Sequence, residues 1–133
     1  MAVRGIRGAI TAEANTADAI VEATETLLRE LVTLNQLDVD EVAFAYLTTT
    51  PDLNAEFPAL GARRLGWVDV PLLCGHDMNV ALPNPRGVAR CIRALLLYNT
   101  DKTQREMRHA YLRGAAAIKA DLEAMRTSLQ VPR

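Results

Sequence analysis

A short apolar run with an arginine inside it constrains the fold of this chain more than any other feature. Residues 91–97 read Cys-Ile-Arg-Ala-Leu-Leu-Leu and are flanked by turn-prone residues, which is the pattern of a buried strand. A guanidinium keeps its charge inside a protein, and burying one without a partner is costly. We therefore expect Arg93 to meet an anionic group, either a carboxylate of the protein or a ligand.

Arg7, in the N-terminal segment, is a second arginine within an apolar strand pattern and is also expected to meet an anionic group. Residues 3–10 read as a strand, and by alternation Arg7 shares one face with Gly5 and Ala9. Those two residues are too small to fill a core, so this face is expected to form a pocket wall with a charged floor. The interior glycines also indicate close approach of a ligand or of another backbone.

Length and composition limit the class of protein. With 133 residues, the chain is expected to form one domain over residues 1–133. The formal net charge is −1, and no basic stretch offers a phosphate-binding footprint, which argues against nucleic-acid binding. No apolar run has membrane-spanning length and no signal-peptide pattern occurs, so we expect a cytoplasmic protein without a membrane partner.

The two cysteines, Cys74 and Cys91, lack the spacing of a redox or metal-binding motif. They could form a disulfide, but two free thiols are the simpler expectation in a reducing cytoplasm. Cys74-Gly75-His76-Asp77 could be read as metal ligands, but no second half with ligand spacing accompanies it. We therefore expect neither a metal nor a cofactor.

The hydrophobic pattern predicts an α+β domain. Apolar residues at helical spacing predict one long helix, about residues 16–35, with Asn15 as its N-cap. Predicted strands span residues 2–12, 42–47, 67–73, 91–98 and 108–112, a short helix spans residues 59–65, and residues 75–89 read as a loop. Residues 114–125 have helical character over a turn or two. This order predicts a mixed β-sheet packed against one long helix.

One long helix cannot cover both faces of such a sheet. The predicted strands are apolar on both sides, so the second face is expected to be buried by a partner. A homo-oligomer with closed symmetry is the natural arrangement.

Motifs for covalent or nucleotide chemistry are missing from the sequence. It contains no nucleophile elbow, P-loop or dinucleotide fingerprint. What remains is a set of fixed cations and hydrogen-bonding groups that suits a dicarboxylate and a reaction without proton transfer, in which the protein orients the substrate and stabilises developing charge. The set comprises Arg7, Arg63, Cys74, Asp77, Arg93, Tyr111 and Lys119. Taken singly, each except Arg93 also has a purely structural interpretation.

Five segments, in order along the chain, resemble one known family. They are residues 3–11, 50–59, 70–74, 91–93 and 108–112, and they read VRGIRGAIT, TPDLNAEFPA, VPLLC, CIR and RHAYL. Together they resemble the Bacillus-type (AroH-class) monofunctional chorismate mutases, from about residue 3 to about residue 122. The resemblance implies a homotrimer with a pseudo-α/β-barrel arrangement and active sites in the clefts between subunits. It also implies conversion of chorismate to prephenate for phenylalanine and tyrosine biosynthesis, by an intramolecular Claisen rearrangement without cofactor or covalent intermediate.

The resemblance further implies a role for each site residue. Arg93 would donate to the ether oxygen of the substrate, Arg7 would hold a substrate carboxylate, and Asp77 would take the substrate hydroxyl. Phe57 would pack on the substrate ring, and Arg63 would add positive potential near the entrance. The remaining residues, Ala59, Leu73, Cys74 and Tyr111, would line the site, and Lys119 would close it from a C-terminal segment expected to be mobile over about residues 120–133.

The chain departs from the family pattern at four places, one of which is Leu60, at a position commonly charged in the family. Asp77 stands where the family usually has glutamate, and Lys119 followed by Ala120 stands where arginine followed by proline is usual. The stretch 81–90 is a few residues longer than usual. These departures leave a second interpretation open, a non-catalytic trimer that binds a metabolite of the aromatic pathway. A trimeric imine-hydrolysing barrel is a third, supported by fold analogy alone.

Overall fold

The structure is a computed structural model that describes residues 1–80, 84 and 87–132. Its strands are β1 (Ala2–Thr11), β2 (Val42–Thr49), β3 (Leu72–His76), β4 (Cys91–Thr100) and β5 (Ala110–Leu112). Its α-helices are α1 (Ala17–Asn35), α2 (Ala59–Arg64) and α3 (Ala116–Leu129), and its short 3-10 helices are η1 (Val39–Glu41), η2 (Gln104–Glu106) and η3 (Arg113–Ala115).

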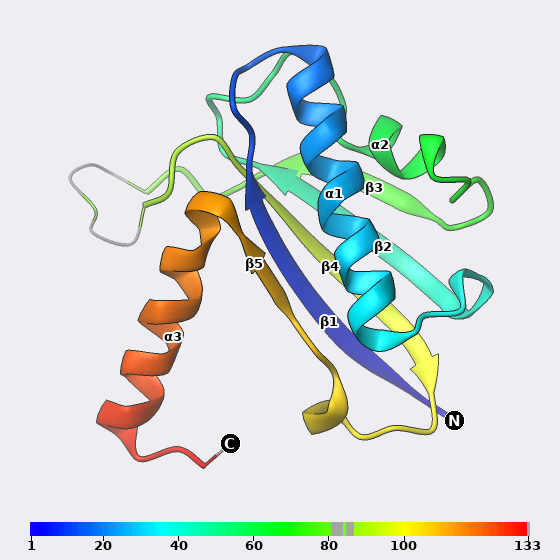
Figure 1. The fold of residues 1–133 in the computed structure, drawn as a ribbon, viewed down its shortest axis with the longest axis vertical. Helices are drawn as coiled ribbons and strands as arrows, with labels where there is room; N and C mark the ends of the chain where they lie inside the picture. Colours follow the sequence, from blue (N-terminus) through cyan, green and yellow to red (C-terminus); the bar gives the residue numbers. More distant parts are fainter. Residues whose placement is uncertain (81–83, 85–86, 133) are drawn as a thin grey trace.

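The strands of the described residues form one mixed sheet in the order β3-β2-β4-β1-β5 (Figure 1). The central strand β4 runs antiparallel to both β1 and β2. The outer strands β5 and β3 pair in parallel with β1 and β2, and α2 lies in the connection between β2 and β3. The predicted α+β class with a mixed sheet is therefore confirmed.

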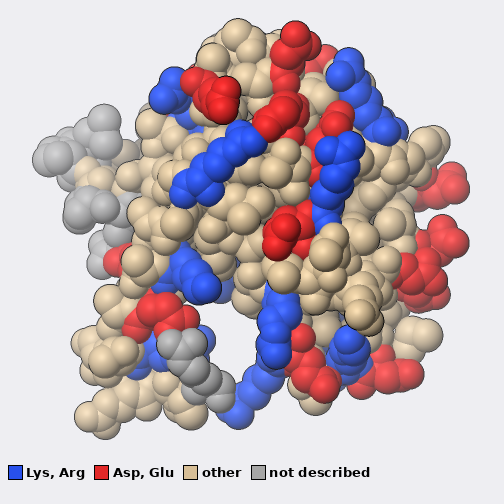
Figure 2. Space-filling model, in the orientation of Figure 1, with Lys and Arg blue, Asp and Glu red and all other residues tan. Residues whose placement is uncertain are grey.

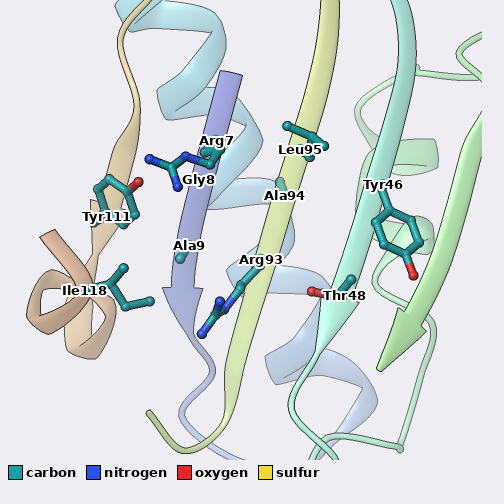
Figure 3. A pocket seen from close by; sticks show the side chains of 10 residues that line it. All are labelled: Arg7, Gly8, Ala9, Tyr46, Thr48, Arg93, Ala94, Leu95, Tyr111 and Ile118. Atoms are coloured by element: carbon teal, nitrogen blue, oxygen red, sulfur yellow. The ribbon is translucent and has the colours of Figure 1, made fainter. Parts of the chain in front are cut away.

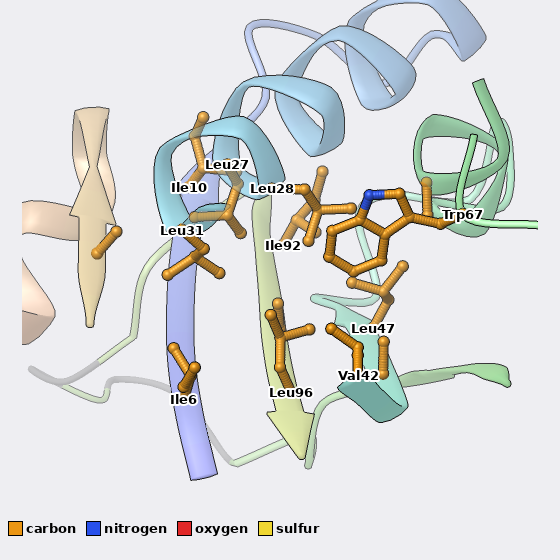
Figure 4. Close-up of a cluster of buried hydrophobic side chains, with 14 of the residues drawn as sticks. Ile6, Ile10, Leu27, Leu28, Leu31, Val42, Leu47, Trp67, Ile92 and Leu96 are labelled. Carbon is orange, nitrogen blue, oxygen red and sulfur yellow. The ribbon is translucent and has the colours of Figure 1, made fainter. Parts of the chain in front are cut away.

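The main core lies between α1 and one face of the sheet (Figure 4). Its fully buried members include Ile6, Ile10, Leu27, Leu28, Leu31, Ile92 and Leu96. The helix approaches β1 closely at Gly8, where an added Cβ would lie 2.9 Å from Leu27 Cδ1 and 3.0 Å from Leu31 Cδ1. Gly8 thus makes room for leucine side chains of the helix, whereas the sequence pattern indicated a ligand or another backbone.

The opposite face of the sheet carries the alternate residues of the same strands. Arg7 on β1 and Arg93 on β4 lie there, together with apolar side chains that the single chain leaves exposed. Leu73 is 57% exposed and Leu95 is 38% exposed. Arg93 itself has a side chain 49% exposed, so the expectation that it is buried is wrong for the single chain, because only the α1 side of β4 is covered.

The N-cap of α1 is Thr16 and not the predicted Asn15. The Thr16 hydroxyl accepts a hydrogen bond from the Ala19 N–H at 3.2 Å. The Asn15 side chain is used elsewhere, because its Oδ1 accepts from the N–H groups of Asn54 and Ala55, each at 3.0 Å. Asn15 therefore ties the start of the helix to the loop after β2.

The third strand begins later than the sequence pattern predicted. β3 runs Leu72–His76, paired with residues 45–49 of β2, whereas residues 67–73 were expected. Trp67 is only 3% exposed and belongs to the core, but it reaches the core from the turn after α2. The predicted loop over residues 75–89 consequently starts after His76, and its residues 81–83 and 85–86 lie outside the described residues.

The C-terminal helix is longer than the predicted turn or two. α3 spans Ala116–Leu129 and lies beside β5 at the edge of the sheet (Figure 1). None of the residues of α3 is classed as buried in the single chain. The mobility expected for this segment stays a prediction.

Candidate active site

A pocket opens on the sheet face opposite α1 and is bordered by the start of α3 (Figure 3). Its volume is about 180 Å³. Residues from β1, β2, β4, β5 and α3 line it, including Arg7, Ala9, Tyr46, Thr48, Arg93, Leu95, Tyr111 and Ile118. Strand alternation explains this grouping, because residues two apart on a strand share a face and paired residues on neighbouring strands lie side by side.

Arg93 and Asp77 form an ion pair at one end of this pocket. The Arg93 Nε lies 3.2 Å from Asp77 Oδ2. Asp77 directly follows β3, and its other oxygen, Oδ1, accepts a hydrogen bond of 2.5 Å from the Thr48 hydroxyl. Thr48 is also the residue of β2 paired with Arg93 of β4. Three strands therefore meet at one guanidinium–carboxylate pair.

The Asp77 carboxylate keeps spare capacity to accept a hydrogen bond. Its Oδ2 is buried and has no hydrogen-bond donor among the described residues. The 3.2 Å contact with Arg93 is an ion pair whose geometry does not meet hydrogen-bond criteria. Arg93 and Asp77 also border a wider cleft of about 710 Å³, which the residues that follow β2 and β3 help to line. A ligand in this cleft would lie beside the Asp77 carboxylate, whose Oδ2 has lone pairs that no described donor uses.

Arg7 stands on the neighbouring strand with His109 behind its backbone. The Arg7 N–H donates to His109 Nδ1 at 2.9 Å. Burial lowers the pKa of His109 below its ordinary value, and the positive charge of Arg7 lowers this pKa further. A neutral His109 is thus an acceptor that fixes the backbone of Arg7 and leaves its guanidinium to the pocket side (Figure 3).

Tyr111 presents an unused hydroxyl beside Arg7. It pairs with Ala9 across the parallel β1–β5 ladder, which places its ring on the pocket face. Its hydroxyl is buried and lacks a hydrogen-bond partner among the described residues. A buried polar group without a partner is costly, so a ligand that reached this hydroxyl would satisfy an unused hydrogen-bonding group.

The start of α3 adds an apolar wall and a lysine. Ile118 lines the pocket itself. Lys119 borders an adjoining cleft of about 440 Å³ that also includes Arg7, Tyr111 and Arg105. Lys and Arg side chains border the opening between α3 and the rest of the molecule in Figure 2. This part of the site is therefore electropositive.

The remaining predicted site residues are not brought into this pocket. Ala59 and Cys74 pack against the core on the α1 side of the sheet, and the exposed Phe57 precedes α2. Arg63 on α2 donates through Nη1 to the carbonyls of Trp67 at 2.6 Å, Val68 at 3.0 Å and Val70 at 3.3 Å. Leu73 shares the open face, where it pairs with Tyr46, but it does not line the pocket.

The sequence reasoning missed several pocket residues, among them Tyr46, Thr48, Leu95 and Ile118. Tyr46 and Thr48 are two apart on β2, so strand alternation was a usable signal for placing them together. Tyr46 also stacks on Phe44, with ring centroids 6.3 Å apart. Ile118 carried no local signal, because its place depends on how α3 docks against β1 and β5.

Both cysteines are free thiols, as expected from their spacing. Cys74 packs toward the α1 side, whereas Cys91 is buried with Ala9 and Ala115 on the other face. Burial raises the pKa of both thiols, and Arg93 only partly offsets this rise for Cys91.

In the described part of the chain, no three His, Cys, Asp or Glu side chains gather in a way that could hold a metal ion. No described helix is long and apolar enough to cross a membrane.

This arrangement can bind a small anion and stabilise charge that develops on it. Two guanidinium groups and a tyrosine side chain line a pocket with apolar walls, and a carboxylate pairs with one of the guanidinium groups beside it. Fixed donors of this kind stabilise a developing negative charge without reorganising during the reaction.

Comparison with known proteins identifies the family of this chain. Residues 3–122 match the family model described as chorismate mutase type I. The chain is 44% identical over 123 residues to chorismate mutase AroH of Thermus thermophilus, covering 92% of this chain and 98% of that protein. It is 38% identical over 123 residues to chorismate mutase AroH of Bacillus subtilis, covering 92% and 94%.

A solved structure supports the same relationship. A chorismate mutase from Clostridium thermocellum superposes with a TM-score of 0.80 at 41% identity, covering 85% of this chain and 97% of that one. The mixed α+β fold is therefore that of a chorismate mutase. The chain belongs to the chorismate mutase type I family, in its AroH class.

Proposed function

We propose that this protein is a chorismate mutase, an isomerase that converts chorismate to prephenate by an intramolecular Claisen rearrangement. The observation that carries the proposal is that Arg7 and Arg93, on neighbouring strands, line the same pocket, and that Asp77 forms an ion pair with Arg93. Chorismate is a dicarboxylate with a hydroxyl and an ether oxygen, so it offers each of these groups a chemical partner.

The rearrangement needs charge stabilisation at the ether oxygen. As the C–O bond breaks and the new C–C bond forms, negative charge grows on that oxygen. We assign Arg93 to donate to it, because Asp77 at its Nε orients the guanidinium while the terminal nitrogens remain for the substrate. A donor that acts on charge present only in the transition state raises the rate and not merely the affinity.

The other groups hold the substrate in its reactive shape. We assign Arg7 to a substrate carboxylate, with Tyr111 as a further donor, and Asp77 to the substrate hydroxyl. A flexible molecule held in a near-attack geometry loses most of its entropic barrier before reaction. Lys119 is assigned to a carboxylate at the rim of the site, next to Arg7.

The site is completed by a second copy of the chain, in a homotrimer with clefts between subunits. The single-chain pocket measures about 180 Å³, whereas small-molecule sites usually enclose at least ~300 Å³. Leu73 and Leu95 are exposed on the open face, and Phe57, Ala59, Arg63 and Cys74 lie away from the pocket. We propose that these last four residues serve the site of the neighbouring subunit.

Two measurements test the proposal. Purified protein incubated with chorismate is expected to yield prephenate, identified by NMR, at a rate proportional to enzyme concentration. A non-catalytic binder would take up chorismate and leave it unchanged, which would refute the activity. Light scattering is expected to give the mass of three chains, and a monomer at micromolar concentration would remove the intersubunit site.

The proposed reaction indicates a pathway, and the free cysteines indicate a compartment. Prephenate is the precursor of phenylalanine and tyrosine, so the enzyme would serve aromatic amino-acid biosynthesis. We propose a cytoplasmic location, where the two free thiols would stay reduced.

A further inference from the structure

Arg113 holds an unusual backbone conformation at the junction between β5 and α3. Its φ angle is 55°, in the left-handed region that residues other than glycine seldom adopt. Such a conformation persists where surrounding contacts stabilise it. The contacts of Arg113 therefore indicate what this turn is built to hold.

The Arg113 side chain ties this turn to two other elements. Its Nη2 donates to both carboxylate oxygens of Glu22 on α1, and the longer of the two bonds is 3.0 Å. Its Nη1 lies 3.3 Å from the carbonyl of Thr11 at the end of β1. The hydrogen bond to Glu22 raises the pKa of the guanidinium, so Arg113 stays positively charged.

The next residue strengthens the same junction. The Gly114 N–H donates to the Thr11 hydroxyl at 3.1 Å. A Cβ at Gly114 would lie 2.9 Å from Thr11 Cγ2, so the close approach depends on glycine. Residues 113 and 114 thus fasten the η3 turn to the end of β1 and to the first turns of α1.

Apolar packing also holds the start of α3 against the sheet. Ala115 is fully buried with Ala9 and Cys91, and Ile118 packs against this small cluster. None of the residues of α3 is classed as buried in the single chain. A helix without buried residues has a marginal docked state, so the contacts at its start help to determine how often it is docked.

We propose that Arg113, through its ion pair with Glu22, is a positioning residue that keeps α3 docked and thereby places Ile118 and Lys119 at the pocket. This role rests on the proposed function of the pocket, because Arg113 itself does not line it. A site that is competent only when α3 is docked has an apparent affinity reduced by the docked fraction. The ion pair should therefore act on KM more than on kcat.

The experiment compares two disruptions of the ion pair with a matched control. Arg113→Gly removes the guanidinium and tolerates the positive φ, and Glu22→Gln removes the partner charge without touching the turn. Glu25→Gln is the control, since it breaks another ion pair of α1, Glu25 with Arg29 at 3.3 Å, which does not involve the turn before α3. The readouts are amide hydrogen exchange of α3 and steady-state kinetics with chorismate.

Both disrupted variants are expected to exchange the α3 amides several-fold faster and to raise KM by roughly three- to tenfold with kcat within about twofold. Glu25→Gln should match the wild type in both readouts. The charge-exchanged pair Arg113→Glu with Glu22→Arg should recover part of the α3 protection and part of the KM.

Two results would overturn the proposal. Unchanged α3 exchange in Arg113→Gly and Glu22→Gln would show that the ion pair does not hold the helix. Faster exchange with an unchanged KM would show that the docked helix does not serve the site. If the wild-type protein does not convert chorismate, the proposed function fails separately, and the exchange data still decide whether the ion pair docks α3.

Discussion

Arg93 and Asp77 meet across the strand that separates them. Arg93 lies on β4 and Asp77 follows β3, while β2 runs between these strands, yet Arg93 Nε and Asp77 Oδ2 are 3.2 Å apart. Thr48 of β2 completes the contact, since it pairs with Arg93 and its hydroxyl bonds Asp77. The anionic partner expected for Arg93 from the apolar run is therefore an internal carboxylate, and the ligand assigned to this arginine is additional to it.

Asp77→Asn should lower kcat/KM by about tenfold or more, because a hydrogen bond to a charged group contributes ~1.5–3 kcal/mol. The change removes both the charge that faces Arg93 and the charged acceptor assigned to the substrate hydroxyl. Asp69→Asn, at an exposed position before β3, serves as the control and should have wild-type kinetics. Wild-type kinetics in Asp77→Asn would show that the carboxylate is not used.

Gly8→Ala should destabilise the protein by ~1–3 kcal/mol, because an added methyl would press on Leu27 and Leu31 of a packed core. Gly5→Ala is the matched control on the same strand, since the nearest atoms to its added Cβ lie at 3.9 Å. Urea unfolding followed by the fluorescence of buried Trp67 measures both. Equal stabilities for the two variants would contradict the close packing of α1 on β1.

Lys119→Ala should raise KM more than it lowers kcat. A contact to a carboxylate at the rim binds the ground state and the transition state about equally, so it contributes to affinity. Steady-state kinetics measure the effect, and Lys102→Ala, which changes the other lysine, is the control with wild-type values expected. A collapsed kcat with an unchanged KM would show that the assigned role is wrong.

Stability should fall as the pH drops through the ordinary pKa of histidine, 6.5. The pKa of His109 is lower in the folded state, because of burial first and of Arg7 second. Below 6.5 the unfolded chain therefore binds a proton that the folded protein resists, and the stabilisation present above 6.5 is lost down to the folded pKa.

His109→Asn isolates this effect, because the amide oxygen can still accept from the Arg7 N–H while it cannot titrate. Urea unfolding between about pH 7.5 and about pH 5.5 should show a shallower loss of stability in this variant than in the wild type. Parallel losses in both proteins would mean that His109 does not contribute to the pH dependence.

Local patterns predicted the elements whose structure depends on local forces. The apolar stripe of α1 and the alternation at Arg7 and Ala9 both correspond to what the structure shows. The β3 strand did not follow its local pattern, because Trp67 is buried from a turn and the strand begins where β2 offers a parallel partner. Asn15 and Thr16 are both good N-caps, and only the distant Asn54 and Ala55 decide between them.

The sequence predicted most of the charged residues of the candidate site but not the apolar residues that line it. Arg7, Arg93 and Tyr111 line one pocket with Asp77 beside it, as expected of residues that share a strand face or end a neighbouring strand. Ile118 was missed because η3 and the Arg113 contacts determine where α3 begins. Phe57 and Arg63 lie away from the pocket of the single chain because α2 and the residues beside it pack on the α1 side of the sheet, a tertiary contact that local patterns do not describe.

The kinetics of Arg93 variants test the central claim most directly. If Arg93 stabilises charge on the breaking ether bond, Arg93→Ala should lower kcat by about a hundredfold to a thousandfold with little change in KM. Arg93→Lys keeps the charge without the planar fork and should be impaired less, and both variants should remain folded trimers by light scattering. A folded, trimeric Arg93→Ala with the wild-type kcat would contradict the account.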